Sequence, residues 1–221
     1  MKKLLALLTL FLPWGLRRFI LQRYYGYQIH PTAKIGLAWI FPEQLIMKEF
    51  SSIGHLTVCK SLSLLSMGAH SHLGRGNWVT GYPKAGREFF TAEPDRVPEL
   101  IIGDHSAITN RHIIDCTNSI RIGRFTTMAG FRSQILTHSI DLLQSRQASA
   151  PVKIGDYCFL GTDCVVLGGS VLPDYCVLGA KSLLRNSFEQ PRYLYAGVPA
   201  RPVKPMDSSI KYFERTTGFV Y

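Results

Sequence analysis

Residues 154–184 read IGDYCFLGTDCVVLGGSVLPDYCVLGAKSLL. Aliphatic residues return at every sixth position of this stretch: Ile154, Leu160, Val166, Leu172, Leu178 and Leu184. Small residues follow five of them at a distance of four: Cys158, Cys164, Ser170, Cys176 and Ser182; Phe188 is the exception. A period of six fits neither an α-helix, with about 3.6 residues per turn, nor the alternation of a simple strand. The pattern predicts short strands and corners, three to a turn, stacked into a prism with the aliphatic residues inside.

The same pattern extends upstream with interruptions. Its members are Ile29, Ile35, Ile53, Cys59, Leu65, Ile102, Ile108 and Ile114, followed after a shift of two by Ile122 and Met128. Residues 82–100 and 138–153 break the pattern and are predicted to form outward loops. The sequence therefore predicts an all-β domain, a parallel β-helix over residues 29–187. An extension over 188–221 is expected to be extended and turn-rich, with a short helix near 207–212.

Composition and charge narrow the class of protein. The chain has 221 residues, 46% of them hydrophobic and 18% charged, so it is expected to bury a core. The net charge of +10 is not accompanied by a recognised nucleic-acid-binding motif, and no nucleic-acid partner is expected. The five cysteines show no metal-ligand spacing, and three of them lie at the small inward positions. We therefore expect neither a metal site nor a disulfide framework, but buried thiols in a reducing compartment.

Residues 1–28 are predicted to form an amphipathic helix. The uncharged run from Leu4 to Leu16 is 13 residues long, short of the roughly 20 that span a bilayer, and no signal-peptide cleavage site follows it. One helical face carries apolar residues, namely Leu16, Phe19, Ile20 and Tyr24. Arg17, Arg18 and Arg23 are expected to reach phosphate head groups of an anionic membrane. The hypothesis is a cytoplasmic chain peripheral to the membrane; the alternative is a helix packed on its own domain or on a neighbouring subunit.

The stretch beginning at Ile154, together with YAGVPARPVK at residues 195–204, resembles the hexapeptide-repeat acyltransferases. The similarity covers about residues 101–204. It is greatest to the branch of galactoside, maltose and nodulation-factor O-acetyltransferases and of capsule and lipopolysaccharide acetyltransferases. The resemblance implies a left-handed β-helix, acetyl-CoA as the acyl donor, and a homotrimer with active sites between subunits.

The resemblance also assigns a catalytic base. The segment RIGRFTTMAGFRSQILTH ends at His138, the position of the family's catalytic histidine. A neutral imidazole that titrates near the working pH can remove the acceptor's hydroxyl proton, an effect typically of about 10²–10⁴ in rate. The other six histidines are expected to be structural or solvated, including His105 and His112. Because no Ser-His-Asp arrangement is apparent, direct transfer without an acyl-enzyme is expected.

Further site residues are implied by the same resemblance. Asn110, Arg146 and Phe159 are expected to contact the acceptor, although Asn110 and Asp115 also suit tight turns. A backbone amide near Gly161 and Thr162 is expected to stabilise the oxyanion. The cofactor's pantetheine arm is placed near Ala180, and its phosphates at the basic residues Arg201, Lys204 and, more weakly, Arg185.

The expected function is O-acetylation of a sugar hydroxyl, in capsule, lipopolysaccharide or another surface glycan, with a sugar or lipid-linked glycan as the acceptor. An N-acetyltransferase acting on an amino sugar and a non-catalytic scaffold of a glycan-assembly complex remain alternatives. A γ-class carbonic anhydrase is disfavoured, because the sequence has no pair of histidines separated by four residues.

Overall fold

The computed structural model describes residues 9–84 and 89–220. These residues form a parallel β-helix whose three faces are sheets A, B and C. Sheet A contains β1 (Gln28–Ile29), β4 (Gln44–Met47), β7 (Leu64–Met67), β10 (Glu99–Ile102), β13 (Ile120–Ile122), β18 (Val152–Ile154) and β21 (Val171–Leu172). Sheet B contains β2 (Lys34–Ile35), β5 (Ser52–Ile53), β8 (His72–Leu73), β11 (Ala107–Ile108), β14 (Thr127–Met128), β19 (Phe159–Leu160), β22 (Val177–Leu178), β24 (Tyr193–Gly197) and β25 (Ala200–Pro205). Sheet C contains β3 (Trp39–Phe41), β6 (Val58–Lys60), β9 (Trp78–Thr80), β12 (Ile113–Asp115), β15 (Gln134–Leu136), β20 (Val165–Leu167) and β23 (Leu183–Leu184).

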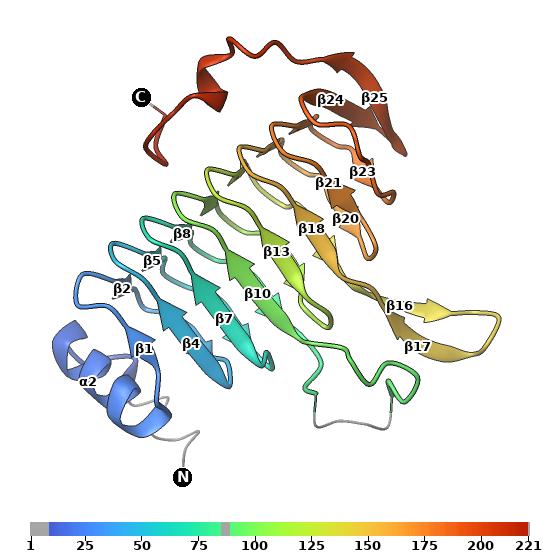
Figure 1. Ribbon diagram of the computed structural model, residues 1–221. Helices are drawn as coiled ribbons and strands as arrows, with labels where there is room; N and C mark the ends of the chain where they lie inside the picture. Colours follow the sequence, from blue (N-terminus) through green and yellow to red (C-terminus); the bar gives the residue numbers. More distant parts are fainter. Residues whose placement is uncertain (1–8, 85–88, 221) are drawn as a thin grey trace.

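The coils wind in the left-handed sense. In Figure 1 the strands of sheet A lie in front and point to the upper left, while the chain advances from lower left to the top. Each strand pairs in parallel with the strand one coil away, as in the register Ile122 to Ile154 to Leu172. The predicted fold class is therefore confirmed.

The inward aliphatic residues form one continuous core. Ile154, Leu160 and Val166 are buried, and so are Ile53 and Cys59 in the part where the sequence pattern is weaker. The register explains that weakness, because Met47 pairs with Met67, twenty residues later, whereas Ile154 pairs with Leu172, eighteen later. The two additional residues lengthen the strand of sheet A in these coils. Such a strand points two apolar side chains inward, which shifts the six-residue pattern by two positions.

Both interruptions of the pattern lie at the corner between sheets C and A. The first insertion occupies 81–98, between β9 and β10, so the predicted limit of 100 was too late: Glu99 and Leu100 already belong to sheet A. The second is not an irregular loop but an antiparallel hairpin, β16 (His138–Asp141) and β17 (Arg146–Ser149). Val152 and Lys153 belong to β18 rather than to this insertion.

Helix α2 (Trp14–Tyr25) lies across the N-terminal end of the prism (Figure 1). Its side chains donate hydrogen bonds to carbonyl groups of the first coil. Arg17 binds the carbonyl oxygens of Gly36 and Ala38, both at 2.7 Å, and the Trp14 indole binds that of Ala33 at 3.1 Å. The helix thus satisfies an edge that would otherwise be open to other strands.

The prediction that Arg17 reaches lipid phosphates is wrong. Its side chain is 2% exposed and is occupied by these carbonyls, while Arg18 donates to the carbonyl of Pro31. The exposed residues of the helix are Leu16, Phe19, Arg23 and Tyr24 among others. Lys2, Lys3 and the apolar residues from Leu4 to Leu8 lie outside the described residues. No described helix meets the length and hydropathy needed to cross a bilayer.

The extension after the last coil covers the opposite end. β24 and β25 form an antiparallel hairpin that continues sheet B, and a 3-10 turn, η1 (Lys211–Phe213), replaces the short helix predicted near 207–212. The chain then returns along the corner between sheets A and B (Figure 1), where the Tyr212 hydroxyl donates to the carbonyl of Cys158 at 3.0 Å. This segment packs against a column of stacked rings. The column includes Phe125 and Tyr157, whose ring centres lie 4.7 Å apart.

The buried arginine of α2 generates a stability prediction. Arg17→Ala removes two charge-assisted hydrogen bonds from partly or fully buried carbonyls, and we expect it to lower the free energy of unfolding by about 2–3 kcal/mol. Arg23→Ala, on the exposed side of the same helix, is the matched control and is expected to change it by less than about 0.5 kcal/mol. Urea denaturation followed by circular dichroism measures both. Equal losses in the two variants would contradict the capping role.

Candidate active site

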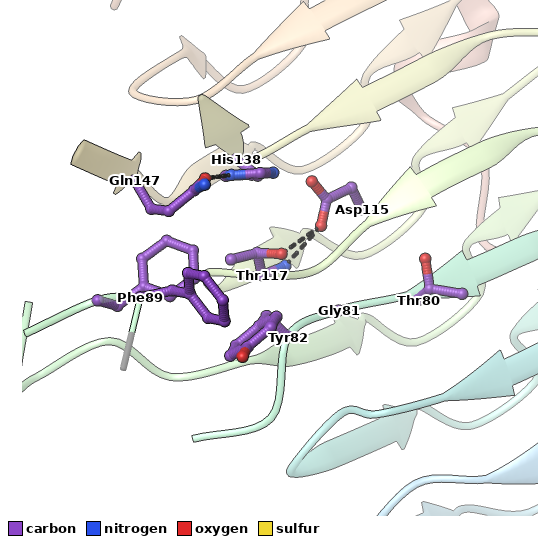
Figure 2. Close-up of a pocket in the computed structure, with 9 residues that line it drawn as sticks. Thr80, Gly81, Tyr82, Phe89, Asp115, Thr117, His138 and Gln147 are labelled. Carbon is purple, nitrogen blue, oxygen red and sulfur yellow. Dashed lines mark hydrogen bonds between the residues drawn. The ribbon is translucent and has the colours of Figure 1, made fainter. Parts of the chain in front are cut away.

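A cavity of about 400 Å³ lies at the corner where both insertions leave the prism (Figure 2). The uninterrupted corner between β12 and β13 supplies its floor, and the insertions on the coils before and after supply its walls. Its lining residues are Thr80, Gly81, Tyr82, Phe89, Phe90, Asp115, Thr117, His138 and Gln147. The position of the cavity follows from the fold. The two insertions leave the same corner two coils apart, so they stand on either side of the coil that lies between them.

His138 is exposed and lies on the wall formed by the hairpin. His138 is the first residue of β16 and directly follows Thr137, a corner residue of the prism. Its backbone is therefore attached to a rigid coil. Its Nε2 atom is hydrogen-bonded to the side-chain oxygen of Gln147. With this amide oxygen as the acceptor, a neutral imidazole carries its proton on Nε2, which leaves the Nδ1 lone pair to accept another. In that tautomer the imidazole has the form that a general base requires.

Asp115 and Thr117 form the floor. One carboxylate oxygen of Asp115 accepts the Thr117 backbone N–H at 2.9 Å and its hydroxyl at 2.6 Å, the expected turn role. The other has no hydrogen-bond partner among the described residues and points toward His138 in Figure 2. Sequence reasoning weighed a turn role for Asp115 against orienting a neighbour and favoured the turn, because nothing in the sequence shows that the next coil carries the histidine.

The first insertion is fixed by a buried arginine. Arg96 is 5% exposed and donates to the carbonyl oxygens of Thr117 at 2.6 Å and Tyr82 at 2.7 Å. Its guanidinium lies 4.3 Å from the ring centre of Phe90, and that ring meets His138 edge to face at 5.7 Å. Burial lowers the pKa of Arg96, while the nearby Glu93 carboxylate raises it. Sequence reasoning missed this wall, since nothing in the sequence shows that Arg96 reaches Thr117 on the next coil.

The two insertions are also tied to each other. The Glu93 carboxylate accepts the backbone N–H of Ser149 at 2.8 Å and is hydrogen-bonded to its hydroxyl. Ser149 is the residue opposite His138 in the hairpin, and the side-chain amide of Asn118 reaches the same hydroxyl at 3.0 Å. The hairpin that carries the histidine is therefore held, through Ser149 on β17, from both the first insertion and the floor.

Four of the predicted site residues lie on the other edge of sheet C, at the corner between sheets B and C. The side-chain oxygen of Asn110 accepts the backbone N–H of Arg75 at 2.9 Å, a contact with the preceding coil and not within its own turn. The Thr162 hydroxyl accepts a hydrogen bond from the backbone N–H of Phe131 and donates one to its carbonyl oxygen. Gly161 and Ala180 pack so closely that a Cβ on the glycine would come within 2.6 Å of the Ala180 nitrogen. One chain therefore does not bring these residues to His138.

A second cavity, of about 350 Å³, lies at this corner and is lined by Arg111, Phe131, Arg132, Thr162, Asp163 and Lys181. Beneath it, His112 is 1% exposed; its Nδ1 accepts the Ser133 backbone N–H at 3.1 Å and its Nε2 lies 3.0 Å from the Thr109 hydroxyl. Burial lowers the pKa of His112 to about 4, so this histidine is neutral at physiological pH. It has the structural role expected for it.

The remaining predicted residues lie apart from both cavities. Arg146 pairs with Asp141 at 3.4 Å across the hairpin, and Phe159 lies on sheet B with the ring of Tyr212 against it. Arg185, Arg201 and Lys204 are exposed near the C-terminal end of the prism. Their roles stay predictions. Within the described residues, no group of three or more His, Cys, Asp or Glu side chains could hold a metal ion.

Several solved structures show a distant likeness to this chain. No protein-family model and no curated protein sequence matches the chain. Among solved structures, a hexapeptide-repeat-containing acetyltransferase of Vibrio cholerae matches 49% of this chain at 24% identity and a TM-score of 0.46, and the chain spans 64% of that structure. The same Vibrio protein complexed with acetyl coenzyme A matches 92% of this chain and 84% of its own length, at 18% identity and a TM-score of 0.48.

A maltose O-acetyltransferase of Clostridium difficile matches 93% of this chain and 84% of its own, at 15% identity and a TM-score of 0.44. Because these identities lie below 25% and the scores below 0.5, the activities belong to those proteins. The function of this chain has to be argued from its own residues.

Proposed function

We propose that this chain is an acetyl-CoA-dependent O-acetyltransferase acting on a sugar hydroxyl, with His138 as the general base. The observation that carries the proposal is the cavity in which an exposed imidazole with a free Nδ1 lone pair faces a carboxylate and an aromatic wall. Aromatic rings with a few convergent polar groups suit a hydroxylated ring. Asp115 has an oxygen available to accept a second hydroxyl of such an acceptor.

The geometry suggests a direct mechanism. Nδ1 of His138 takes the proton of the acceptor hydroxyl as its oxygen bonds to the acetyl carbonyl carbon. The carbon–sulfur bond of the thioester then breaks, and the imidazolium returns the proton to the departing thiolate. The products are an acetyl ester and free CoA, and the base is regenerated. Gln147 accepts the Nε2 proton's hydrogen bond throughout, while the Glu93–Ser149 contact holds the hairpin that carries the base.

The residues predicted for the donor fit an anionic molecule. Arg201 and Lys204 on β25 are exposed, and neither has a salt bridge within the described part of the chain. When bound, acetyl-CoA supplies the activated acetyl group; its phosphates would be held by these side chains, and its amides by backbone groups near Ala180.

His138→Ala is expected to reduce turnover by at least about 10²-fold, because the acceptor hydroxyl loses its base, while CoA still binds. Thiol release from acetyl-CoA with a panel of sugars measures turnover, and calorimetry measures binding. The background is low because the chain's own five cysteines are buried. His30→Ala, an exposed histidine on the first coil, is the control. Turnover in His138→Ala that stays within about threefold of wild type would remove the proposed base; a matched panel of amino sugars tests the amine alternative.

The His138 cavity and the corner that holds Asn110, here called the two half-sites, lie on opposite edges of sheet C. Their separation favours assembly of several copies of the chain. The outer face of sheet C presents a column in direct register that is apolar at all positions but one: Trp39, Val58, Trp78, Ile113, Gln134, Val165 and Leu183. Trp78 is 49% exposed and Ile113 46%. We propose that further copies of this chain cover this face in a homotrimer, so that the Asn110 corner of one protomer adjoins the His138 cavity of the next. A repeated apolar face with a half-site along each edge suits such an arrangement.

Trp78→Glu places a charge in the centre of this face and is expected to yield a folded monomer with little turnover. Lys153→Glu, at an exposed position of sheet A, is the control that changes charge on another face. Sedimentation equilibrium reports the mass, and circular dichroism reports the fold. A wild-type chain that sediments as a monomer would contradict the assembly.

The N-terminal end supports a place at a membrane surface, where a lipid-linked glycan of a capsule or lipopolysaccharide would be met. Phe11 is 81% exposed, and Leu16 and Phe19 on the outer side of α2 are 50% and 60% exposed. Residues 9–42 contain four basic residues and no acidic one, and Arg23 lies on the exposed side of the helix. An apolar surface with cations at its margin suits the interface of an anionic bilayer.

Phe19→Glu is expected to abolish co-flotation of the full chain with phosphatidylglycerol vesicles, because it puts a negative charge into the face that would enter the lipid. Leu143→Glu, at a hairpin residue that is 94% exposed, is the matched control and should float like wild type. Equal flotation of both variants, or none by the wild type, would contradict the proposal.

A further inference from the structure

Three arginines lie together at the corner between sheets B and C, and we call Arg75, Arg111 and Arg132 the arginine edge. They belong to successive coils: the backbone nitrogen of Arg111 donates to the carbonyl of Arg75 at 3.0 Å, and that of Arg132 to the carbonyl of Arg111 at 3.1 Å. All three side chains are exposed. The stacking of coils, about 4.8 Å apart, therefore brings three positive charges into one column.

The fold gives these charges no counterion. Within the described part of the chain, none of the three guanidinium groups makes a salt bridge, and the one acidic residue lining the adjacent cavity, Asp163, pairs with Lys181 at 3.3 Å. Like charges at the same corner of successive coils repel each other. No acidic side chain in the described part of the chain offsets this repulsion, whereas a bound anion would.

The surroundings indicate the kind of anion. Arg111 and Arg132 line the second cavity, which at about 350 Å³ is large enough for a small phosphorylated group. Phe131, between them on the chain and 49% exposed, adds an apolar ring beside the charges. A planar guanidinium group can bind two phosphate oxygens at once. Several such groups in one row suit two linked phosphates better than one carboxylate.

We propose that the arginine edge is a binding site for a diphosphate group. Two substrates of the proposed reaction could carry that group: the acyl donor, CoA, whose diphosphate would then lie here and not at Arg201 and Lys204, and an acceptor sugar attached to a nucleotide or lipid diphosphate. The existence of the site does not depend on His138 being a base; only the choice between these two sources depends on the proposed function.

Calorimetric titration of the full chain with inorganic pyrophosphate tests the site without turnover. The double variant Arg111→Gln/Arg132→Gln is expected to bind pyrophosphate at least about tenfold more weakly than the wild type, because two charge-assisted contacts are lost. The control, Lys34→Gln/Lys153→Gln, removes the same net charge from exposed positions on other faces and is expected to stay within about twofold. If the arginine variant binds like this control, or if the wild type does not bind pyrophosphate, the proposal is overturned.

Titrations with CoA, acetyl-pantetheine and UDP identify the source. If the donor supplies the diphosphate, the arginine variant loses affinity for CoA about tenfold but keeps that for acetyl-pantetheine, which has no phosphate. If the acceptor supplies it, CoA binding is retained and UDP binding is lost. Both results support the site. Unchanged affinity for CoA and for UDP would overturn it, even in a variant that retains full acetyltransferase activity.

Discussion

Parallel hydrogen bonding between successive coils is the interaction on which the rest of the structure depends. It is held in register by inward aliphatic residues such as Leu160 and Leu178, which pack one above the other along the axis. Because register repeats at every coil, any corner position becomes a column along the prism. Rings such as Phe125 and Tyr157 gather at the corner of sheets A and B. Arginines gather at the corner of B and C, and both insertions at the corner of C and A.

This arrangement turns a repetitive core into a specific cavity. The insertions at 81–98 and 138–151 leave the prism at one corner, and the coil between them forms the floor. Their positions are then fixed by a few polar contacts: Arg96 reaches the floor carbonyl of Thr117, and Glu93 reaches Ser149 opposite the histidine. In the proposed reaction a histidine on a free loop would lose rotational entropy on each turnover, whereas this one is already oriented.

The same geometry explains why one chain carries two incomplete sites. The width of sheet C separates the His138 cavity from the corner that holds Asn110, Thr162 and Ala180. A rigid prism cannot fold these edges onto each other, and in the proposed trimer a neighbouring copy would complete the site. The exposed apolar column between the two edges, which includes Trp78, is the surface through which such a copy would bind.

The sequence by itself determined the coiled architecture, the buried ladder and the place of both insertions, because a period of six leaves only one kind of backbone able to bury those aliphatic residues. It also singled out His138. Tertiary structure alone decided which residues meet. Asp115 faces His138, Arg96 reaches the carbonyl of Thr117, and Arg17 caps the first coil instead of meeting lipid. The physical reason is that these contacts join separate elements of the fold, and the distance along the chain between such residues is set by insertions and lengthened strands that local patterns do not encode.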